Sequence, residues 1–241
     1  MSAELRRVGA FKRSLTALKN RLGALAGLKQ SADLDYIRAY AAADLSEDYW
    51  TVVGPTTRAE YDELSKIKLD YLAECGLTPN SRLLDVGCGT GQVAQSCETW
   101  LSADGTYFGV DIAAECIEYC KRRFTRQNFH FAVNEPTSLA IEGMTFDAAC
   151  FFSVFTHTYL SETVLLLAET ARLLSPDGWV FADVFTSTGI EDSEGGRARM
   201  VVNREQFIRL TRLAGFAEAQ VVFAQETADQ ASREFFRLTR G

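Results

Sequence analysis

The stretch RLLDVGCGTGQVAQ, residues 82–95, decides the fold of this chain. It opens with a short apolar run that contains one acid, Asp85, and continues with Gly87, Gly89 and Gly91 at intervals of two. A short apolar run predicts a buried strand, and closely spaced glycines let the backbone turn sharply and approach a ligand. The stretch therefore indicates a strand, a ligand-binding loop and the start of a helix.

Strand and helix patterns alternate through the rest of the chain, which predicts a mostly parallel sheet with helices on both faces. We expect an α/β fold, Rossmann-like and doubly wound, with a seven-stranded sheet and an N-terminal helical extension. The expected strands span residues 82–86, 106–111, 128–133, 146–152, 179–185, 217–226 and 233–240, and the expected helices span 57–75, 92–100, 113–124, 161–174 and 203–214. We expect two units, an N-terminal segment at 1–56 and the sheet domain at 57–241.

Composition favours a soluble, globular, intracellular protein. Of 241 residues, 47% are hydrophobic and 24% are charged, and no apolar run approaches the roughly 20 residues that span a bilayer. The six cysteines include no C-x-x-C pair, and there are only two histidines, so no zinc site is expected. Reduced thiols predict a cytoplasmic location.

The net charge of −7 is unevenly distributed. Residues 1–30 hold seven Lys/Arg and one acid, whereas the remainder holds 18 basic and 31 acidic residues, so we expect no nucleic-acid partner. Apolar residues at intervals of three and four predict a basic amphipathic helix over 5–28. Three interpretations stay open for it: a helix packed on a partner or lid, a helix on an anionic membrane surface, or an organellar presequence.

The glycine loop lies where ligands bind in open parallel sheets, at the carboxyl ends of the strands. Asp111 ends the second strand, 20 residues after Gly91, where a carboxylate accepts hydrogen bonds from ribose hydroxyls. This much suits a nicotinamide dinucleotide or S-adenosylmethionine (SAM). The spacing G-x-G-x-G differs from the dinucleotide pattern G-x-G-x-x-G, and the nearby Asp85 would repel a pyrophosphate. The loop therefore favours SAM, which carries an ammonium and a sulfonium group.

Several stretches resemble a known family. LLDVGCGTG resembles the first motif of class I SAM-dependent methyltransferases, and GVD, which ends in Asp111, resembles the second. FDAACFFSVFTH resembles the fourth strand and following loop of the branch that methylates small molecules, lipids and sugars. The resemblance covers roughly residues 57–241 and implies SAM as the cofactor, with no metal.

The resemblance also implies a set of cofactor contacts. They are Asp85, Gly87, Cys88, Gly89, Gly91, Asp111, Ile112, Asn134, Glu135, Phe152 and Ser153. The family usually carries G-D-A or a similar run after the third strand, with Asp on the adenine amine. This chain has NEPTSL instead, and either Asn134 or Glu135 suits that role.

The acceptor side is expected from the loop after the fourth strand and from the N-terminal third. His157 follows that strand and suits a base or an orienting group, although a loop histidine bonded to backbone is the alternative. Tyr49, Trp50, Arg58 and Tyr159 are the expected acceptor contacts, with Tyr36 and Tyr40 in the same aromatic-rich segment. The function expected is SAM-dependent methyl transfer to an oxygen of a small-molecule, sugar or lipid-linked acceptor. The alternative is a non-catalytic protein that binds SAM or a nucleoside and has a regulatory or assembly role.

Overall fold

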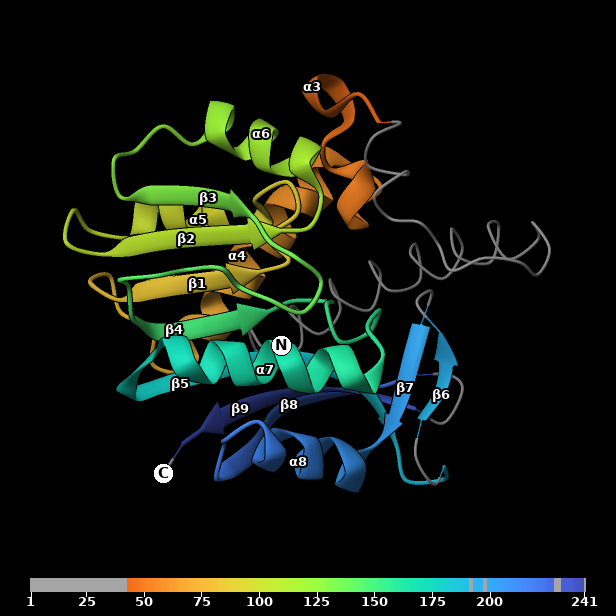
Figure 1. Cartoon of the computed structure of the whole chain (residues 1–241). Coiled ribbons are helices and arrows are strands. Elements are labelled where there is room, and N and C mark those ends of the chain that lie inside the picture. Colours follow the sequence, from red (N-terminus) through yellow and green to blue (C-terminus); the bar gives the residue numbers. More distant parts are fainter. Residues whose placement is uncertain (1–42, 191–192, 197–198, 228–230, 241) are drawn as a thin grey trace, which may run out of the picture.

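The structure is a computed structural model, and its central feature is one twisted sheet between two layers of helices (Figure 1). The expected basic helix over 5–28, together with Tyr36 and Tyr40, lies outside the described residues. The structure describes residues 43–190, 193–196, 199–227 and 231–240.

Within the described ranges, the sheet contains nine strands. Its path β3-β2-β1-β4-β5 is parallel, β9 pairs antiparallel with β5, and β8 pairs antiparallel with β9. Since the chain winds outward from β1 in both directions, the Rossmann-like fold class is confirmed. The strands are β1 Arg82–Val86, β2 Thr106–Asp111, β3 Phe129–Val133, β4 Phe146–Phe151, β5 Leu174–Ser187, β6 Ser193–Gly196, β7 Arg199–Asn203, β8 Glu218–Glu226 and β9 Ser232–Thr239.

The expectation of seven strands is wrong, because β6 and β7 add a hairpin between β5 and the last helix. β4 stops pairing with β5 at Ala182, and β7 takes over the same edge of β5 from Phe185 to Ser187. β6 is short, polar and glycine-containing, and β7 is a five-residue run without apolar–polar alternation in its sequence, so neither carries the pattern of a half-buried strand. The hairpin is stabilised by pairing with the part of β5 that extends beyond β4. A contact between such distant segments leaves no local pattern in the sequence.

The helices begin and end close to their expected positions, with recognisable caps. Thr57 accepts the N–H of Glu60 at 3.1 Å, and Asn203 accepts that of Gln206 at 3.1 Å. The bounds are α3 Leu45–Asp48, η1 Thr51–Val53, α4 Arg58–Glu74, α5 Gln92–Trp100, α6 Ala114–Arg123, α7 Leu160–Leu173 and α8 Arg204–Leu213. No helix in the described ranges is long and apolar enough to cross a membrane.

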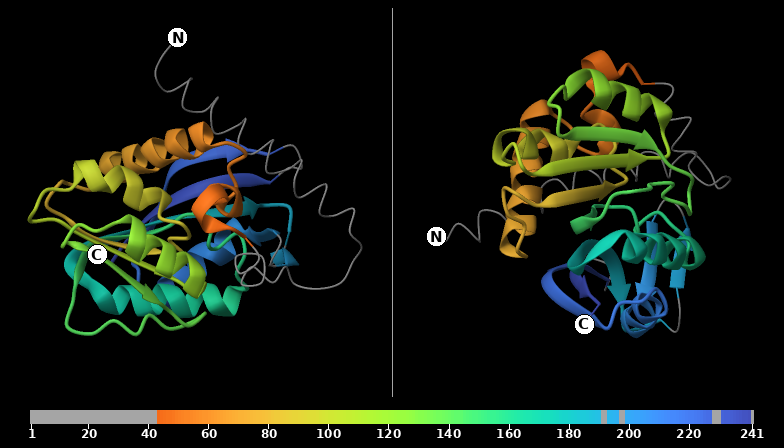
Figure 2. Two further views of the ribbon diagram at one scale, coloured as in Figure 1. Left: turned by 90° about the horizontal axis from the view of Figure 1, so that it is seen from above. Right: turned by 60° about the vertical axis from the view of Figure 1, so that its left-hand side comes forward.

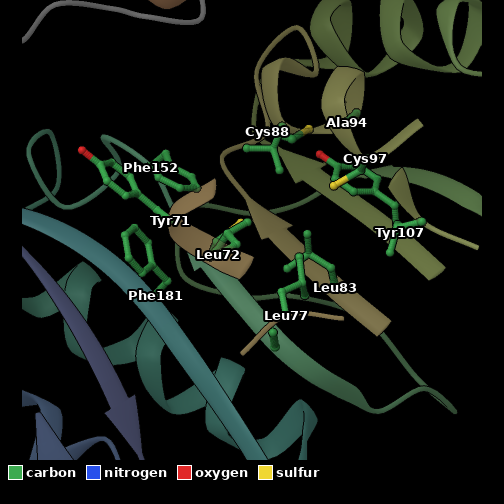
Figure 3. Close-up of a cluster of buried hydrophobic side chains, with 14 of the residues drawn as sticks. Tyr71, Leu72, Leu77, Leu83, Cys88, Ala94, Cys97, Tyr107, Phe152 and Phe181 are labelled. Atoms are coloured by element: carbon green, nitrogen blue, oxygen red, sulfur yellow. The ribbon is translucent and has the colours of Figure 1, made fainter. Parts of the chain in front are cut away.

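Two apolar layers enclose the sheet, with α4, α5 and α6 on one face and α7 and α8 on the other (Figure 2). Neighbouring strand residues point to opposite layers, so Leu83 packs toward α4 and α5 while Leu84 packs toward α7. Figure 3 shows the first layer, in which Tyr71 of α4 and Phe181 of β5 lie close together. Because β3, β2, β1, β4 and β5 run parallel, their carboxyl ends meet at one edge of the sheet, where the ligand-binding loops are expected.

Candidate active site

The chain turns sharply between β1 and α5, in left-handed backbone conformations. Gly87 has a φ of +76° and Gly89 a φ of +53°. A Cβ atom on Gly87 would lie 2.5 Å from Cγ2 of Val154, and one on Gly89 would lie 2.7 Å from Cγ1 of Val53. Glycine is therefore required at both positions, for the backbone angle and for the close approach of neighbouring side chains.

Asp111, at the end of β2, is bonded to this loop. Its Oδ2 accepts the N–H of Gly89 at 2.8 Å, and its Oδ1 accepts the N–H of Ala113 at 2.9 Å. Burial raises the pKa of this carboxyl, and the N–H donors oppose that shift. A carboxylate oxygen can accept more than one hydrogen bond, so the Asp111 carboxylate has capacity left for ligand hydroxyls.

The ends of β2 and β3 present one apolar side chain and one unsatisfied polar atom beside Asp111. Ile112 is 37% exposed. The N–H of Asn134 donates to the carbonyl of Asp111 at 3.1 Å, and its Nδ2 donates to the carbonyl of Glu135 at 2.7 Å. Oδ1 of Asn134 is buried and has no hydrogen-bond partner within the part of the chain that the structure describes. The Glu135 side chain is exposed.

The segment that contains α3 and η1 covers the glycine loop. The hydroxyl of Thr90 donates to the carbonyl of Tyr49 at 3.1 Å, and the hydroxyl of Tyr61 donates to the carbonyl of Thr90 at 3.1 Å. The ring of Tyr49 stacks on that of Tyr119, with centroids 5.4 Å apart. Val53 completes the contact by lying against Gly89. This part of the N-terminal segment is therefore packed on the loop.

The other expected acceptor contacts flank the same edge. Trp50 packs edge-on against Tyr49, with ring centroids 5.0 Å apart, and Arg58 is exposed at the start of α4. Tyr159 is 38% exposed and is the N-cap of α7, where its N–H donates to Oε2 of Glu162 at 2.9 Å. The expected start of this helix at Ser161 is therefore wrong, because the cap lies two residues earlier.

The loop after β4 packs directly on the glycine loop. Val154 contacts Gly87, and the N–H of His157 donates to the carbonyl of Val154 at 2.9 Å. The imidazole of His157 is half-buried. The carbonyl of Thr156 accepts the N–H of Met200 in β7 at 2.8 Å, so the hairpin that the sequence did not predict forms one side of this loop.

Two of the expected cofactor contacts have side chains that lie in the interior. The Phe152 ring packs against that of Phe181 at 5.2 Å between centroids, with Nζ of Lys68 at 4.9 Å from its centre. The Cys88 side chain is also buried, which raises the pKa of its thiol. The side chains of Phe152 and Cys88 therefore pack in the core, which leaves their backbone atoms for the expected ligand.

Asp85 is likewise directed away from the loop surface. Its Oδ2 accepts the hydroxyl of Tyr107 at 2.5 Å, and the Cys150 thiol donates to its Oδ1 at 3.4 Å. Burial raises the pKa of Asp85, and the nearby Lys68 ammonium and the hydrogen bonds oppose that shift. Burial also lowers the pKa of Lys68, against the attraction of Asp85 and Asp183. We propose that Asp85 acts by supporting the loop from below, instead of by touching a ligand.

The comparisons with known proteins agree with this geometry. Residues 84–182 match the family model described as a methyltransferase domain. A ubiquinone biosynthesis O-methyltransferase of Paraburkholderia phymatum is 27% identical over 82% of this chain and 86% of its own length. A second, from Xanthomonas campestris pv. campestris (strain B100), is 27% identical over 61% of this chain, which spans 59% of that relative. Magnesium protoporphyrin IX methyltransferase from Synechocystis PCC 6803, solved with S-adenosylhomocysteine (SAH) bound, superposes with a TM-score of 0.59 at 15% identity. That superposition covers 86% of this chain and all of the other.

Over residues 84–182 the chain is similar to a methyltransferase domain, and its fold is that of solved methyltransferases. The glycine loop and the acid at the end of β2 are the parts of the chain expected to hold SAM, and the residues present there fit that cofactor. Gly87 and Gly89 allow the tight turn of the loop under Val154 and Val53, and Asp111 keeps acceptor capacity beside it. Oδ1 of Asn134 lacks a donor, which the adenine amine would supply. In the described ranges, the chain has no group of three or more His, Cys, Asp or Glu that could hold a metal ion.

The sequence patterns did not point to three charged residues that lie beneath the two loops. Lys68, Asp183 and Arg233 come from α4, β5 and β9, and the ion pair between Asp183 and Arg233 is buried. A signal was available, since Asp183 interrupts the otherwise apolar run WVFADVF and Arg233 begins the strand REFF. A charged residue at an inward-facing strand position needs a partner, and pairing the two requires the β5–β9 register.

Proposed function

We propose that this chain transfers the methyl group of SAM to an oxygen atom of a small-molecule acceptor. The observation that carries the proposal is the contact between the two loops: Val154, three residues before His157, packs on Gly87 of the cofactor loop. A group that acts on the acceptor is thereby placed next to the loop that holds the methyl donor. The names of the two relatives, both O-methyltransferases, support oxygen as the acceptor atom.

We assign the cofactor contacts as follows. SAM, when bound, supplies a methyl group on a sulfonium centre. Asp111 accepts hydrogen bonds from the ribose hydroxyls, Ile112 lies against the adenine, and Oδ1 of Asn134 accepts from its amine. Gly91, Ser153 and the backbone of Cys88 form the remaining wall, and Glu135 lies at its exposed rim. Holding donor and acceptor in line is worth about 7–11 kcal/mol of barrier in well-oriented reactions.

We assign the acceptor side to His157 and to side chains from the two flanking segments. A hydroxyl acceptor must lose its proton as the methyl group arrives, and a neutral imidazole takes a proton readily near pH 7. Tyr49, Trp50 and Arg58 approach from the N-terminal side, and Tyr159 approaches from the start of α7. The same site suits a small-molecule, sugar or lipid-linked hydroxyl compound.

Methyl transfer from labelled SAM to a panel of hydroxyl compounds, with mass spectrometry of the product, tests this function. His157→Ala should lower turnover by about 10²–10⁴-fold and leave SAH affinity unchanged. His130→Ala is the matched control, because that histidine is exposed on β3 and should retain full turnover. Methylation of nitrogen or carbon, or equal turnover of the two variants, would contradict the assignment. Binding of SAH without transfer to any acceptor would favour the non-catalytic alternative.

We further propose that residues 5–28 bring the site to an anionic membrane surface that presents a lipid-linked acceptor. The sequence pattern supports this, since six basic residues of this segment accompany an apolar stripe, and each adds about 1 kcal/mol near an anionic surface. Co-sedimentation with anionic vesicles should be lost in a chain that starts at Ser31 and weakened by salt. Equal sedimentation of the two chains would assign the segment to a partner or lid instead.

A further inference from the structure

Ser153, directly after β4, has a backbone conformation that L-residues avoid. Its φ is +62°, and it is the one non-glycine residue with positive φ in the described ranges. Neither a turn glycine nor an asparagine occupies the position, so the sequence itself provides no local reason for this angle. A left-handed residue of this kind persists only where surrounding contacts enforce it.

The contacts that enforce it come from an ion pair inside the sheet. The N–H of Ser153 donates to Oδ1 of Asp183 at 2.6 Å, and Nη2 of Arg233 donates to Oγ of Ser153 at 2.7 Å. Arg233 also donates through Nε to Oδ2 of Asp183 at 2.6 Å. The side chain of Asp183 is 0% exposed and that of Arg233 is 7% exposed. The backbone and the side chain of Ser153 are therefore each held by one member of a buried pair.

The angle at Ser153 determines where the rest of the loop lies. The carbonyl of Ser153 accepts the hydroxyl of Thr156 at 2.9 Å, and the next residue, Val154, fills the space over Gly87. The N–H of His157 then donates to the carbonyl of Val154. A change at Ser153 would consequently move both the contact with the cofactor loop and the backbone of His157.

We propose that Asp183 and Arg233 are positioning residues, which hold Ser153 in its left-handed conformation and thereby set the loop after β4 against the cofactor loop. Neither residue needs to touch cofactor or acceptor. The effect on the reaction rests on the proposed function, whereas the effect on the loop does not. The effect of the pair on the loop can therefore be measured without any methyl acceptor.

β9 contains a second arginine–carboxylate pair that serves as a matched control. Glu234 is buried on the opposite face of β9, where it accepts from Nε of Arg204 at 2.8 Å and from the hydroxyl of Thr186 at 2.7 Å. This pair joins β9 to the start of α8 and lies on the face of β9 opposite to Arg233. Weakening the pair between Arg204 and Glu234 shows how the loss of an arginine–carboxylate contact affects this sheet when Ser153 is not one of its partners.

The test compares two single variants, Arg233→Lys and Arg204→Lys. Each is also made together with Ser153→Gly. Lysine keeps the charge opposite Asp183, which protects folding, but a single ammonium lacks the planar fork that reaches both Asp183 and Ser153. Glycine adopts positive φ without strain, so with glycine at position 153 the loop should no longer need Arg233 to keep this angle. The readouts are hydrogen exchange of the segment 152–158 and calorimetric affinity for SAH.

Arg233→Lys should speed exchange in 152–158 and weaken SAH binding by about tenfold, in line with the strain of a left-handed residue. Adding Ser153→Gly should restore slow exchange in 152–158, while adding Ser153→Ala should not. Arg204→Lys should leave both unchanged. Failure of the glycine to restore exchange, or an equal effect of Arg204→Lys, would overturn the positioning role. Absence of SAH binding in the wild-type chain would instead contradict the proposed function. Hydrogen exchange of 152–158 would still decide whether Asp183 and Arg233 position the loop.

Discussion

The Asp111 carboxylate accepts the backbone N–H of Gly89 at 2.8 Å, so the end of β2 fixes the middle of the glycine loop. An acid that is already anchored in this way needs no rearrangement to accept ribose hydroxyls. The same bond makes the position sensitive to loss of the negative charge, because each backbone donor faces one of its two oxygens.

Asp111→Asn should weaken SAH binding by about 1.5–3 kcal/mol, since charge-assisted hydrogen bonds are lost and an amide N–H₂ must face a backbone donor. Isothermal titration calorimetry measures the change. Asp104→Asn, on the exposed turn before β2, is the control and should bind as the wild type does. Unchanged affinity in Asp111→Asn would remove this residue from the cofactor site.

Gly89→Ala should lower both stability and SAH affinity, because a methyl group would lie 2.7 Å from Val53 at a φ of +53°. Gly143→Ala is a matched control, with a φ of +71° and open space around its Cβ. It should show only the cost of the backbone angle, about 1–2 kcal/mol in urea unfolding. Equal losses in the two variants would show that the contact with Val53 does not matter.

The unsatisfied Oδ1 of Asn134 predicts discrimination at the adenine amine. The wild type should bind SAH more tightly than S-inosylhomocysteine, in which a carbonyl replaces the amine, and Asn134→Ala should lose most of that preference. A preference of about tenfold corresponds to one hydrogen bond of ordinary strength. If Glu135→Ala abolished the preference and Asn134→Ala retained it, the role would pass to Glu135.

The buried carboxyl of Asp85 predicts a pH dependence of stability. Its pKa is raised in the folded state, so its favourable contribution is complete below the unfolded pKa of about 3.9 and is lost as pH rises through the folded value. The free energy of unfolding of the wild type, relative to that of Asp85→Asn, should therefore fall as pH increases above about 4. Urea unfolding of both proteins between pH 4 and 8 measures this difference. A difference that rises with pH would show that Lys68 and the hydrogen bonds outweigh burial.

Local sequence signals predicted most of the parallel sheet. β1 and β2 have the expected bounds, because each is an apolar run closed by an acid or a glycine turn. The caps at Thr57 and Asn203 are confirmed for the same reason, since a cap depends on residues three apart in the chain. The position of Asp111 beside the glycine loop follows from the pairing of two neighbouring parallel strands.

The features that were missed all depend on contacts between distant segments. The β6–β7 hairpin forms on the overhanging end of β5, and the direction of the Asp85 carboxylate is set by Tyr107 and Cys150 across the sheet. The left-handed angle at Ser153 depends on Arg233, 80 residues away. None of these contacts has a period or spacing that a single sequence reveals.

The most direct test of the central claim is calorimetric titration of the full chain with SAH and, separately, with NAD. SAH should bind in the micromolar range at one site per chain, Asp111→Asn should weaken that binding, and NAD should produce no heat of binding. Binding of NAD with no detectable binding of SAH would contradict the claim that this glycine loop holds S-adenosylmethionine.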